Sequence, residues 1–281
     1  DVLSMAASIQ QMLKDANASI GDYIVIAGQT GTNYIASCLA VWSLRCIAVP
    51  VSSSSSSYEL ADICEEHSVS IILDTDALLV FNTQGLNVIN VSKLSFSSYE
   101  IGSFLIDLSQ IDESLPAILL LTSGTSGKSK AVLKSYRSIS NRVAFQCKCL
   151  KPDVVVLQKC AIGFVDSIVE IWASIASGNK MVFVDTHTSA DPYELINILD
   201  EYSVSVLYSV PTMLKHIMDA LDGNVDLLAS LRLVISSGEM LSCGLSQRIL
   251  SCDSKIQLLN IYGLTEAADV TFHNEQLLDL E

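Results

Sequence analysis

The sequence predicts an α/β fold with mostly parallel sheets, and three observations support this prediction. Short apolar runs alternate with apolar residues at helical spacing along nearly the whole chain. Half of the 281 residues are hydrophobic and 17% are charged, which is enough to bury a sizeable core. No apolar run approaches the roughly 18 residues of a membrane helix. We therefore expect buried strands, joined by crossover helices that cover both faces of a sheet.

The first half of the chain shows this alternation in order. Apolar residues recur at helical spacing from Val2 to near Asp15, and Tyr23–Ala27 has the pattern of a short buried strand. The serine run at Ser52–Ser57 is interpreted as a polar connector. The other elements expected here are a helix capped by Asn33 and ending near Leu44, a strand at Ile47–Val51 that Pro50 interrupts, a helix at Tyr58–His67, and strands at Val69–Leu73 and Leu86–Val91.

The second half of the chain shows the same alternation of predicted strands and helices. Pro192 and Pro211 stand where the first turn of a helix accepts proline. We place a boundary between residues 115 and 116, so that a first α/β subdomain covers 1–115 and a second covers 116–281. The expected strands are Ala117–Leu121, Val154–Leu157, Lys180–Val184, Val204–Tyr208, Leu231–Ile235 and Ile256–Leu259. The expected helices are Tyr136–Cys149, Ser167–Ala176, Pro192–Glu201, Pro211–Leu221 and Leu245–Leu250.

Charge and cysteine usage exclude several classes of protein. The net charge of −15 argues against a nucleic-acid surface, which needs a basic footprint. The eight cysteines contain no CxxC pair, and the four histidines form no metal-binding pattern. Buried, reduced thiols of a cytoplasmic protein are the expected account. The chain opens without a signal peptide or a Met, and we expect it to be a fragment.

The stretch Leu119–Val132 carries the first chemical signal. An apolar run leads into hydroxyl side chains, glycines and two lysines. Glycines permit a turn whose successive N–H groups bind an anion, and a lysine adds a mobile positive charge. The expected ligand is a polyphosphate. The stretch is not a Walker A loop, because Thr122 stands where that motif has its first glycine.

This stretch resembles the phosphate loop of the adenylate-forming superfamily of AMP-forming acyl and aminoacyl ligases, T-S-G-[ST]-T-G-x-P-K-G. Ser129 and Ala131 depart from the proline and last glycine of that motif. The resemblance implies that the loop holds the β- and γ-phosphates of ATP and that Lys130 is also catalytic. The implied ATP-binding residues of the loop are Thr122, Ser123, Gly124, Thr125, Ser126, Gly127, Lys128 and Lys130.

A second motif, at residues 260–266, follows the predicted strand that ends at Leu259. It resembles the superfamily's N-x-Y-G-x-T-E motif at every fixed position. Its ring and amide groups suit a purine, its threonine hydroxyl suits the α-phosphate, and its glutamate is a hard oxygen ligand for Mg²⁺. The implied nucleotide-binding residues are Asn260, Ile261, Tyr262, Gly263 and Thr265. Thr265 and Glu266 are the implied catalytic residues, with Glu266 as the metal ligand.

Two further segments complete the resemblance. Ser237-Gly238-Glu239 matches a G-G-E-like turn that borders the adenine in this superfamily. Phe164, Ser167 and Glu170 match an F-D-x-S-x-x-E segment of amino-acid-activating domains, with Asp166 one place after the family's ammonium-binding aspartate. An aspartate shifted by one residue suits an amine shifted by one carbon, as in the β-alanine-activating members and their plant relatives. The implied substrate-pocket residues are Val165, Asp166, Val169, Ile235, Ser237, Ile261 and Asp269.

The resemblance covers the chain as the N-terminal core of a layered αβαβα fold, truncated before the mobile C-terminal domain. It implies an enzyme that uses ATP and Mg²⁺ to convert a small carboxylic acid into an adenylate, for transfer to the thiol of coenzyme A or of a carrier protein's phosphopantetheine. We expect the fragment alone to be deficient in catalysis. Three alternatives stay open: a fatty or aromatic acyl-CoA ligase, a catalytically silent ATP-binding module, and a purely structural Asp166 that caps the helix beginning at Ser167.

Overall fold

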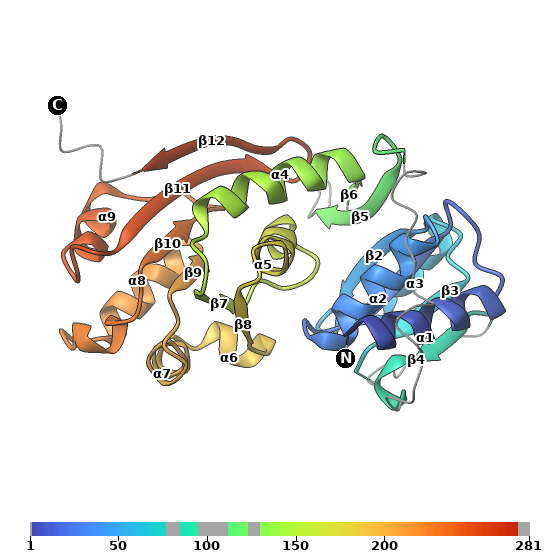
Figure 1. Ribbon diagram of the computed structural model, residues 1–281, viewed down its shortest axis with the longest axis horizontal. Helices are drawn as coiled ribbons and strands as arrows, with labels where there is room; N and C mark the ends of the chain where they lie inside the picture. Colours follow the sequence, from blue (N-terminus) through green and yellow to red (C-terminus); the bar gives the residue numbers. More distant parts are fainter. Residues whose placement is uncertain (1, 77–84, 95–111, 123–129, 275–281) are drawn as a thin grey trace. The chain divides into compact units, whose positions relative to one another are not determined.

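The computed structural model describes residues 2–76, 85–94, 112–122 and 130–274, and only the backbone of 268–270 (Figure 1). The chain forms two compact units. The first comprises Asp1–Ile139 with Ala161–Gly163, and the second comprises Ser140–Cys160 with Phe164–Glu281. No described helix has the length and apolar character required to cross a bilayer.

The first unit contains a six-stranded sheet of order β4-β3-β1-β2-β5-β6. Its described strand pairs are parallel except for the β5–β6 hairpin. Its elements are α1 (Val2–Asp15), β1 (Tyr23–Gly28), α2 (Thr32–Ser43), β2 (Ile47–Ser52), α3 (Ser57–Glu66), β3 (Ile71–Asp74), β4 (Asn87–Asn90), the 3₁₀ turn η1 (Val91–Lys93), β5 (Pro116–Thr122) and β6 (Lys130–Ser135).

Alternate side chains of these strands face opposite layers of helix. Val25, Val49 and Ile72 pack with Leu60 and Ile63 of α3 in one cluster. Helices α1 and α2 pack against each other, and α2 also contacts β1 and β2. Helix α3 is started by a capping box in which the Ser56 hydroxyl accepts from the N–H of Glu59 and the Glu59 carboxylate accepts from the N–H of Ser56.

The second unit contains a six-stranded sheet of order β12-β11-β10-β9-β7-β8. All of its described pairs are parallel except β11–β12. Its elements are α4 (Tyr136–Cys149, which begins in the first unit), β7 (Val155–Gln158), α5 (Val165–Ala176), β8 (Lys180–Phe183), α6 (Thr186–Ala190), α7 (Pro192–Glu201), β9 (Val206–Ser209), α8 (Pro211–Ala220), η4 (Val225–Leu228), β10 (Leu233–Ser236), α9 (Cys243–Leu250), β11 (Gln257–Leu264) and β12 (Ala268–Asn274).

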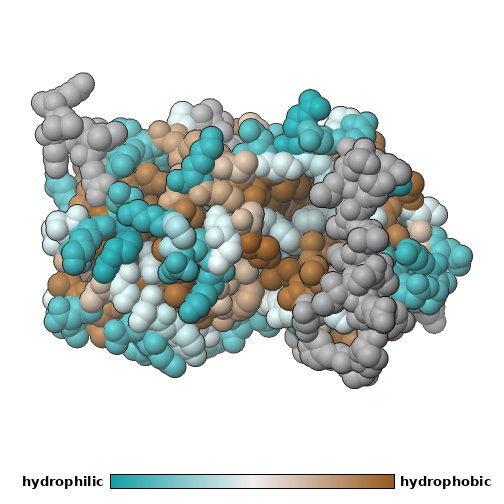
Figure 2. Space-filling view, viewed as in Figure 1, coloured by the Kyte–Doolittle hydropathy of each residue, from teal (hydrophilic) through white to brown (hydrophobic). Residues whose placement is uncertain are grey.

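This sheet also carries helices on both faces. Leu157, Leu207 and Val234 pack in a cluster with residues of α7, α8 and α9. Val156 and Ile235 point the other way and pack with residues of α4 and α5. The outer surface of this unit, at the left of Figure 2, is largely hydrophilic with scattered hydrophobic side chains. The predicted α/β class with mostly parallel sheets is confirmed.

Several expectations about single elements need correction. Strand β2 runs through Pro50 without interruption, with Pro50 paired to Ile26. Gly31, and not Asn33, precedes α2, and the Asn33 amide donates to the carbonyl of Thr75 instead. The boundary expected between residues 115 and 116 precedes β5, which pairs with the first sheet through Ile118. The sequence interpretation also missed β6, α6 and β12.

Candidate active site

The two ends of the predicted phosphate loop, Thr122 and Lys130, lie in an antiparallel hairpin. Thr122 is the last residue of β5 and pairs directly with Lys130, the first residue of β6. Lys130 is exposed and Thr122 is half-buried. The helix predicted after the loop, Tyr136–Cys149, is α4, and the strand β6, which was not predicted, lies between the loop and this helix. The other residues predicted in this loop, Ser123, Gly124, Thr125, Ser126, Gly127 and Lys128, lie outside the described residues.

The two predicted adenine segments line one cavity in the second unit. Residues 238–241 form one wall and residues 260–264 the other, around a volume of about 440 Å³. Tyr262 is 59% exposed and Met240 is 90% exposed. Exposed large apolar side chains beside a concavity offer surface for the flat face of a base. The sequence interpretation did not include Met240.

The motif at residues 260–266 lies on a strand and a turn. Asn260 pairs with Ser236 of β10 on one side and with His273 of β12 on the other. The predicted strand end at Leu259 is therefore wrong, because β11 continues to Leu264 and turns back into β12. Thr265 and Glu266 occupy this hairpin turn, where Thr265 is half-buried and Glu266 is exposed.

The turn at residues 237–239 is fixed by its own contacts. Gly238 has φ +84°, a left-handed conformation that favours glycine. The Glu239 carboxylate accepts hydrogen bonds from the backbone N–H of Thr212 at 2.9 Å and from its hydroxyl at 2.6 Å. These bonds satisfy a donor at the start of α8, whose own N-cap residue supplies no side-chain bond. The Glu239 carboxylate thus secures the turn to α8.

The Asp166 carboxylate is held from two sides. Nη2 of Arg142 donates to Oδ1 of Asp166 at 2.6 Å, and the Ser237 hydroxyl donates to Oδ2 at 2.6 Å. The Arg142 side chain is 7% exposed and that of Asp166 is 27% exposed. Arg142 also donates to the carbonyl of Val165 at 3.1 Å. One carboxylate therefore joins α4, α5 and the turn after β10.

The helix-cap alternative for Asp166 is wrong. Helix α5 begins at Val165, its N-cap residue is Phe164, and the Asp166 side chain makes no capping bond. Asp166 lies in the first turn, where a carboxylate is stabilised by the helix dipole. Sequence reasoning missed Arg142, because a single arginine on a predicted helix gives no sign of a partner that lies 24 positions away.

The predicted pocket walls have different environments. Ile235 and Ile261 are buried in one cluster with Tyr208. Val169 is also buried, whereas Val165 and Ser237 are half-buried. The side chain of Asp269 lies outside the described part of the structure. At the carboxyl ends of β9 and β10, the hydroxyls of Ser209 and Ser236 are buried and have no hydrogen-bond partner among the described residues. Unsatisfied hydroxyls at this edge are consistent with a bound ligand or water.

A buried carboxyl group lies behind Asp166. Glu170 is fully buried, and its Oε2 accepts from the Gln158 amide at 2.9 Å and from the N–H of Cys160 at 2.8 Å. Burial raises the pKa of Glu170 to about 8, so the group is largely protonated at neutral pH. Burial also raises the pKa of the neighbouring Tyr208 hydroxyl. Glu170 thus contributes a neutral hydrogen-bonded support.

The described residues give a simple inventory for metals and thiols. In the described ranges, no group of three or more His, Cys, Asp or Glu side chains could hold a metal ion. All eight cysteines are free, and Cys38, Cys46 and Cys64 are buried. Burial raises the pKa of Cys38 and of Cys46 to about 12, so both thiols stay protonated at neutral pH. Glu266 presents an exposed carboxylate, which suits Mg²⁺ because that ion needs few protein ligands beside phosphate oxygens and water.

The fold and the paired motifs define an adenylate-forming core, and comparison with known proteins gives the same class. The model of the family described as "AMP-binding enzyme" matches residues 1–280, and the chain belongs to that family. The expected membership of the adenylate-forming superfamily, as the N-terminal core of its amino-acid-adenylation type, is confirmed.

The similar curated proteins are large synthetases. The chain is 28% identical over 269 residues to the β-alanyl-bioamine nonribosomal peptide synthetase ebony of Drosophila melanogaster, covering 90% of this chain and 31% of that protein. It is 27% identical to the phosphinothricin tripeptide synthetase PhsB of Streptomyces viridochromogenes, covering 89% of this chain and 21% of that protein. The chain thus spans less than a third of the length of either relative.

Solved structures share the fold. The nonribosomal peptide synthetase FmoA3 in its α-methyl-L-serine-AMP-bound form superposes with a TM-score of 0.87 at 20% identity, over 98% of this chain and 31% of that chain. The N-terminal subdomain of NpsA from Klebsiella oxytoca gives a TM-score of 0.78 at 19% identity, over 97% of this chain and 67% of that chain.

Proposed function

We propose that the chain is the nucleotide- and acid-binding core of an AMP-forming ligase that activates an amino acid, with β-alanine as its substrate. The observation that carries the proposal is the Asp166 carboxylate, which is bonded to Ser237 directly before the first residue of the adenine cavity. An ammonium bound at Asp166 would therefore lie next to bound nucleotide. The β-alanyl part of the Drosophila relative's name supports the same substrate.

The proposed reaction is the attack of the substrate carboxylate on the α-phosphorus of ATP. The bond between the α-phosphorus and the bridging oxygen breaks, so that aminoacyl-AMP forms and pyrophosphate leaves. Catalysis consists mainly of positioning and of compensating negative charge. Residues 122–130 would hold the outer phosphates, with Lys130 contributing a positive charge. Glu266 would hold Mg²⁺, which neutralises phosphate charge when it is bound, and the Thr265 hydroxyl would lie near the α-phosphate.

The adenine base of ATP would lie between the two walls of the cavity. Tyr262 would stack on adenine, and the amide of Asn260 would bind its polar edge. The backbone of Gly238 and Glu239 would border the ring, while Ile261 and Gly263 close the cavity. On the acid side, Asp166 would bind the ammonium, with Val165, Val169 and Ile235 as apolar walls. We propose the thiol of a carrier protein as acceptor, because the similar curated proteins are peptide synthetases.

The test is ATP–pyrophosphate exchange with the full-length protein and a panel of acids: β-alanine, α-amino acids, fatty acids and aromatic acids. We expect β-alanine to give the highest kcat/KM. Asp166→Asn keeps oxygen and nitrogen atoms beside Arg142 and Ser237 but removes the charge, so it should raise the KM for β-alanine at least about tenfold. Asp219→Asn, which changes an exposed carboxylate of the same unit, is the matched control.

Other outcomes of this experiment would separate an error in the proposed substrate from an error in the proposed reaction. If a fatty or aromatic acid is preferred and Asp166→Asn leaves its KM unchanged, the β-alanine proposal is wrong while the ligase reaction stands. If no acid supports exchange and ATP still binds, the protein is a silent nucleotide-binding module. Loss of exchange in Glu266→Gln, with recovery at higher Mg²⁺, would support the metal-ligand role.

A further inference from the structure

A second cavity lies at the opposite edge of the second sheet. It has a volume of about 450 Å³, and its apolar floor includes Val154, Val206 and Leu233. Val206 and Leu233 are the first residues of β9 and β10, and Val154 directly precedes β7. The proposed ligase site uses the carboxyl ends of these strands, so the second cavity is a separate place on the sheet.

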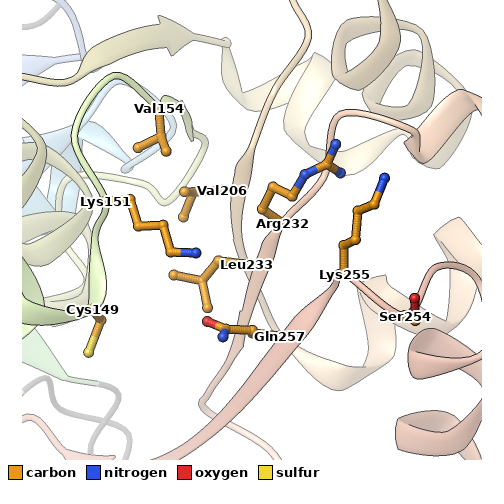
Figure 3. A pocket seen from close by; sticks show the side chains of 9 residues that line it. All are labelled: Cys149, Lys151, Val154, Val206, Arg232, Leu233, Ser254, Lys255 and Gln257. Carbon is orange, nitrogen blue, oxygen red and sulfur yellow. The ribbon is translucent and has the colours of Figure 1, made fainter.

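Three cationic side chains from three segments line this cavity. Lys151 comes from the loop before β7, Arg232 directly precedes β10, and Lys255 lies two residues before β11. In Figure 3, Lys151 extends from one side, while Arg232 and Lys255 come from the neighbouring strand starts. The lining contains no Asp or Glu, although the chain as a whole has a net charge of −15.

The cations have few protein partners of opposite charge. Among the described residues, neither Lys151 nor Lys255 forms an ion pair with a carboxylate. Nη1 of Arg232 donates to the carbonyls of Ala229 and Leu231, which fixes the guanidinium at the rim. The nearby Asp253 uses one carboxylate oxygen to accept from the backbone N–H of Lys255. Three cations that line one cavity, with no carboxylate among the lining residues, give this part of the surface a local positive potential that favours an anion.

The other residues that line the cavity indicate which kind of anion it would bind. Ser254 and Gln257 add a hydroxyl and an amide that can bind oxygen atoms. Burial raises the pKa of the Cys149 thiol, so this wall residue carries no negative charge at neutral pH. Cations at the rim above an aliphatic floor suit a molecule with a doubly charged head and an apolar body. We propose that this cavity binds an organic phosphate monoester, which carries close to two negative charges at neutral pH.

The test is site-resolved protection of lysines from acetylation, read by mass spectrometry, with phenyl phosphate as the probe. Phenyl phosphate should protect Lys151 and Lys255 in a saturable manner and leave the exposed Lys93 of the first unit unprotected. Inorganic phosphate should need a higher concentration for the same protection, since it lacks the apolar body. Lys151→Gln and Lys255→Gln should each weaken binding about fivefold, and Lys93→Gln should leave it unchanged.

Two results would overturn the proposal. One is the absence of protection by phenyl phosphate at either lysine of the cavity. The other is equal protection by inorganic phosphate and phenyl phosphate, which would leave the aliphatic floor without a role. Because acetylation of Lys130 is read in the same experiment, binding at the proposed ATP site is recorded separately. Failure of the ligase proposal therefore does not decide this one.

Discussion

The Ser237 hydroxyl donates a 2.6 Å hydrogen bond to Oδ2 of Asp166, a residue 71 positions earlier in the chain. The other oxygen of the same carboxylate is bonded to Arg142. Asp166 therefore supports the structure in addition to its proposed role in binding an amine. Variants at this position change folding and substrate binding together, so stability has to be measured beside activity.

The first prediction concerns the Arg142–Asp166 ion pair. Asp166→Ala should lower the free energy of unfolding by about 3 kcal/mol, because it removes the carboxylate that compensates the charge of the buried Arg142 guanidinium. Arg142→Met combined with Asp166→Ala should be more stable than Asp166→Ala alone. Urea denaturation of the four members of this double-mutant cycle provides the measurement. Strictly additive effects of the two substitutions would contradict the predicted coupling.

The second prediction concerns pH. The pKa of Glu170 is raised from 4.5 to about 8 in the folded protein, so the native state retains a proton that the unfolded chain releases. The free energy of unfolding should therefore decrease as pH rises from about 4.5 to 8. Glu170→Gln should flatten this dependence, since glutamine does not titrate. Glu113→Gln, which changes an exposed carboxyl group of the first unit, is the control. Parallel pH curves for Glu170→Gln and the unaltered protein would refute the argument.

The third prediction concerns the start of α8. Glu239→Ala should destabilise the protein by about 1 kcal/mol, because the N–H and hydroxyl of Thr212 lose their acceptor. It should also raise the Kd for ATP, since Glu239 belongs to the wall of the proposed adenine cavity. Thermal unfolding and ATP titration measure the two effects. The exposed Glu201, at the end of α7, offers Glu201→Ala as a control for lost charge. An unchanged Tm for Glu239→Ala would argue against the capping role.

The fourth prediction concerns the serine run. Ser56→Ala should cost about 1 kcal/mol of stability, because it removes one half of the capping box of α3. Ser53→Ala changes an exposed serine of the same run and should have an effect close to zero. Chemical denaturation of both variants makes the comparison. Equal losses of stability in Ser56→Ala and Ser53→Ala would mean that Ser56 has no special capping role within the serine run.

The sequence predicted most parallel strands and their helices because each has a strong local pattern. The predicted bounds Tyr136–Cys149 and Pro192–Glu201 coincide with α4 and α7. The missed strands β6 and β12 are antiparallel partners at the edges of their sheets. In β6, Lys130, Ala131 and Leu133 are exposed, so the strand lacks the continuous apolar run of a buried strand.

The candidate site could be predicted only where its chemistry lies within one short stretch. The segments at 237–239 and 260–266 each match a motif, and residues 238–239 of the first and 260–264 of the second line one cavity. The contacts of Asp166 with Arg142 and Ser237 cross the fold, and nothing local to those residues encodes them. The protonated Glu170 also depends on burial, which a single sequence position does not report.

The junction between β2 and β5 has a consequence for how the first sheet opens. The register of β1 and β2 runs from Tyr23 and Ile47 to Gly28 and Ser52, whereas β2 and β5 are matched at Ala48 and Ile118. Because fewer residues are matched between β2 and β5 than between β1 and β2, the β2–β5 pairing is the weaker of the two. In native-state hydrogen exchange, amides of the β5–β6 hairpin should exchange before those of β1. Thr122 and Lys130, the two ends of the predicted phosphate loop, would then separate from the sheet together, as one cooperative segment.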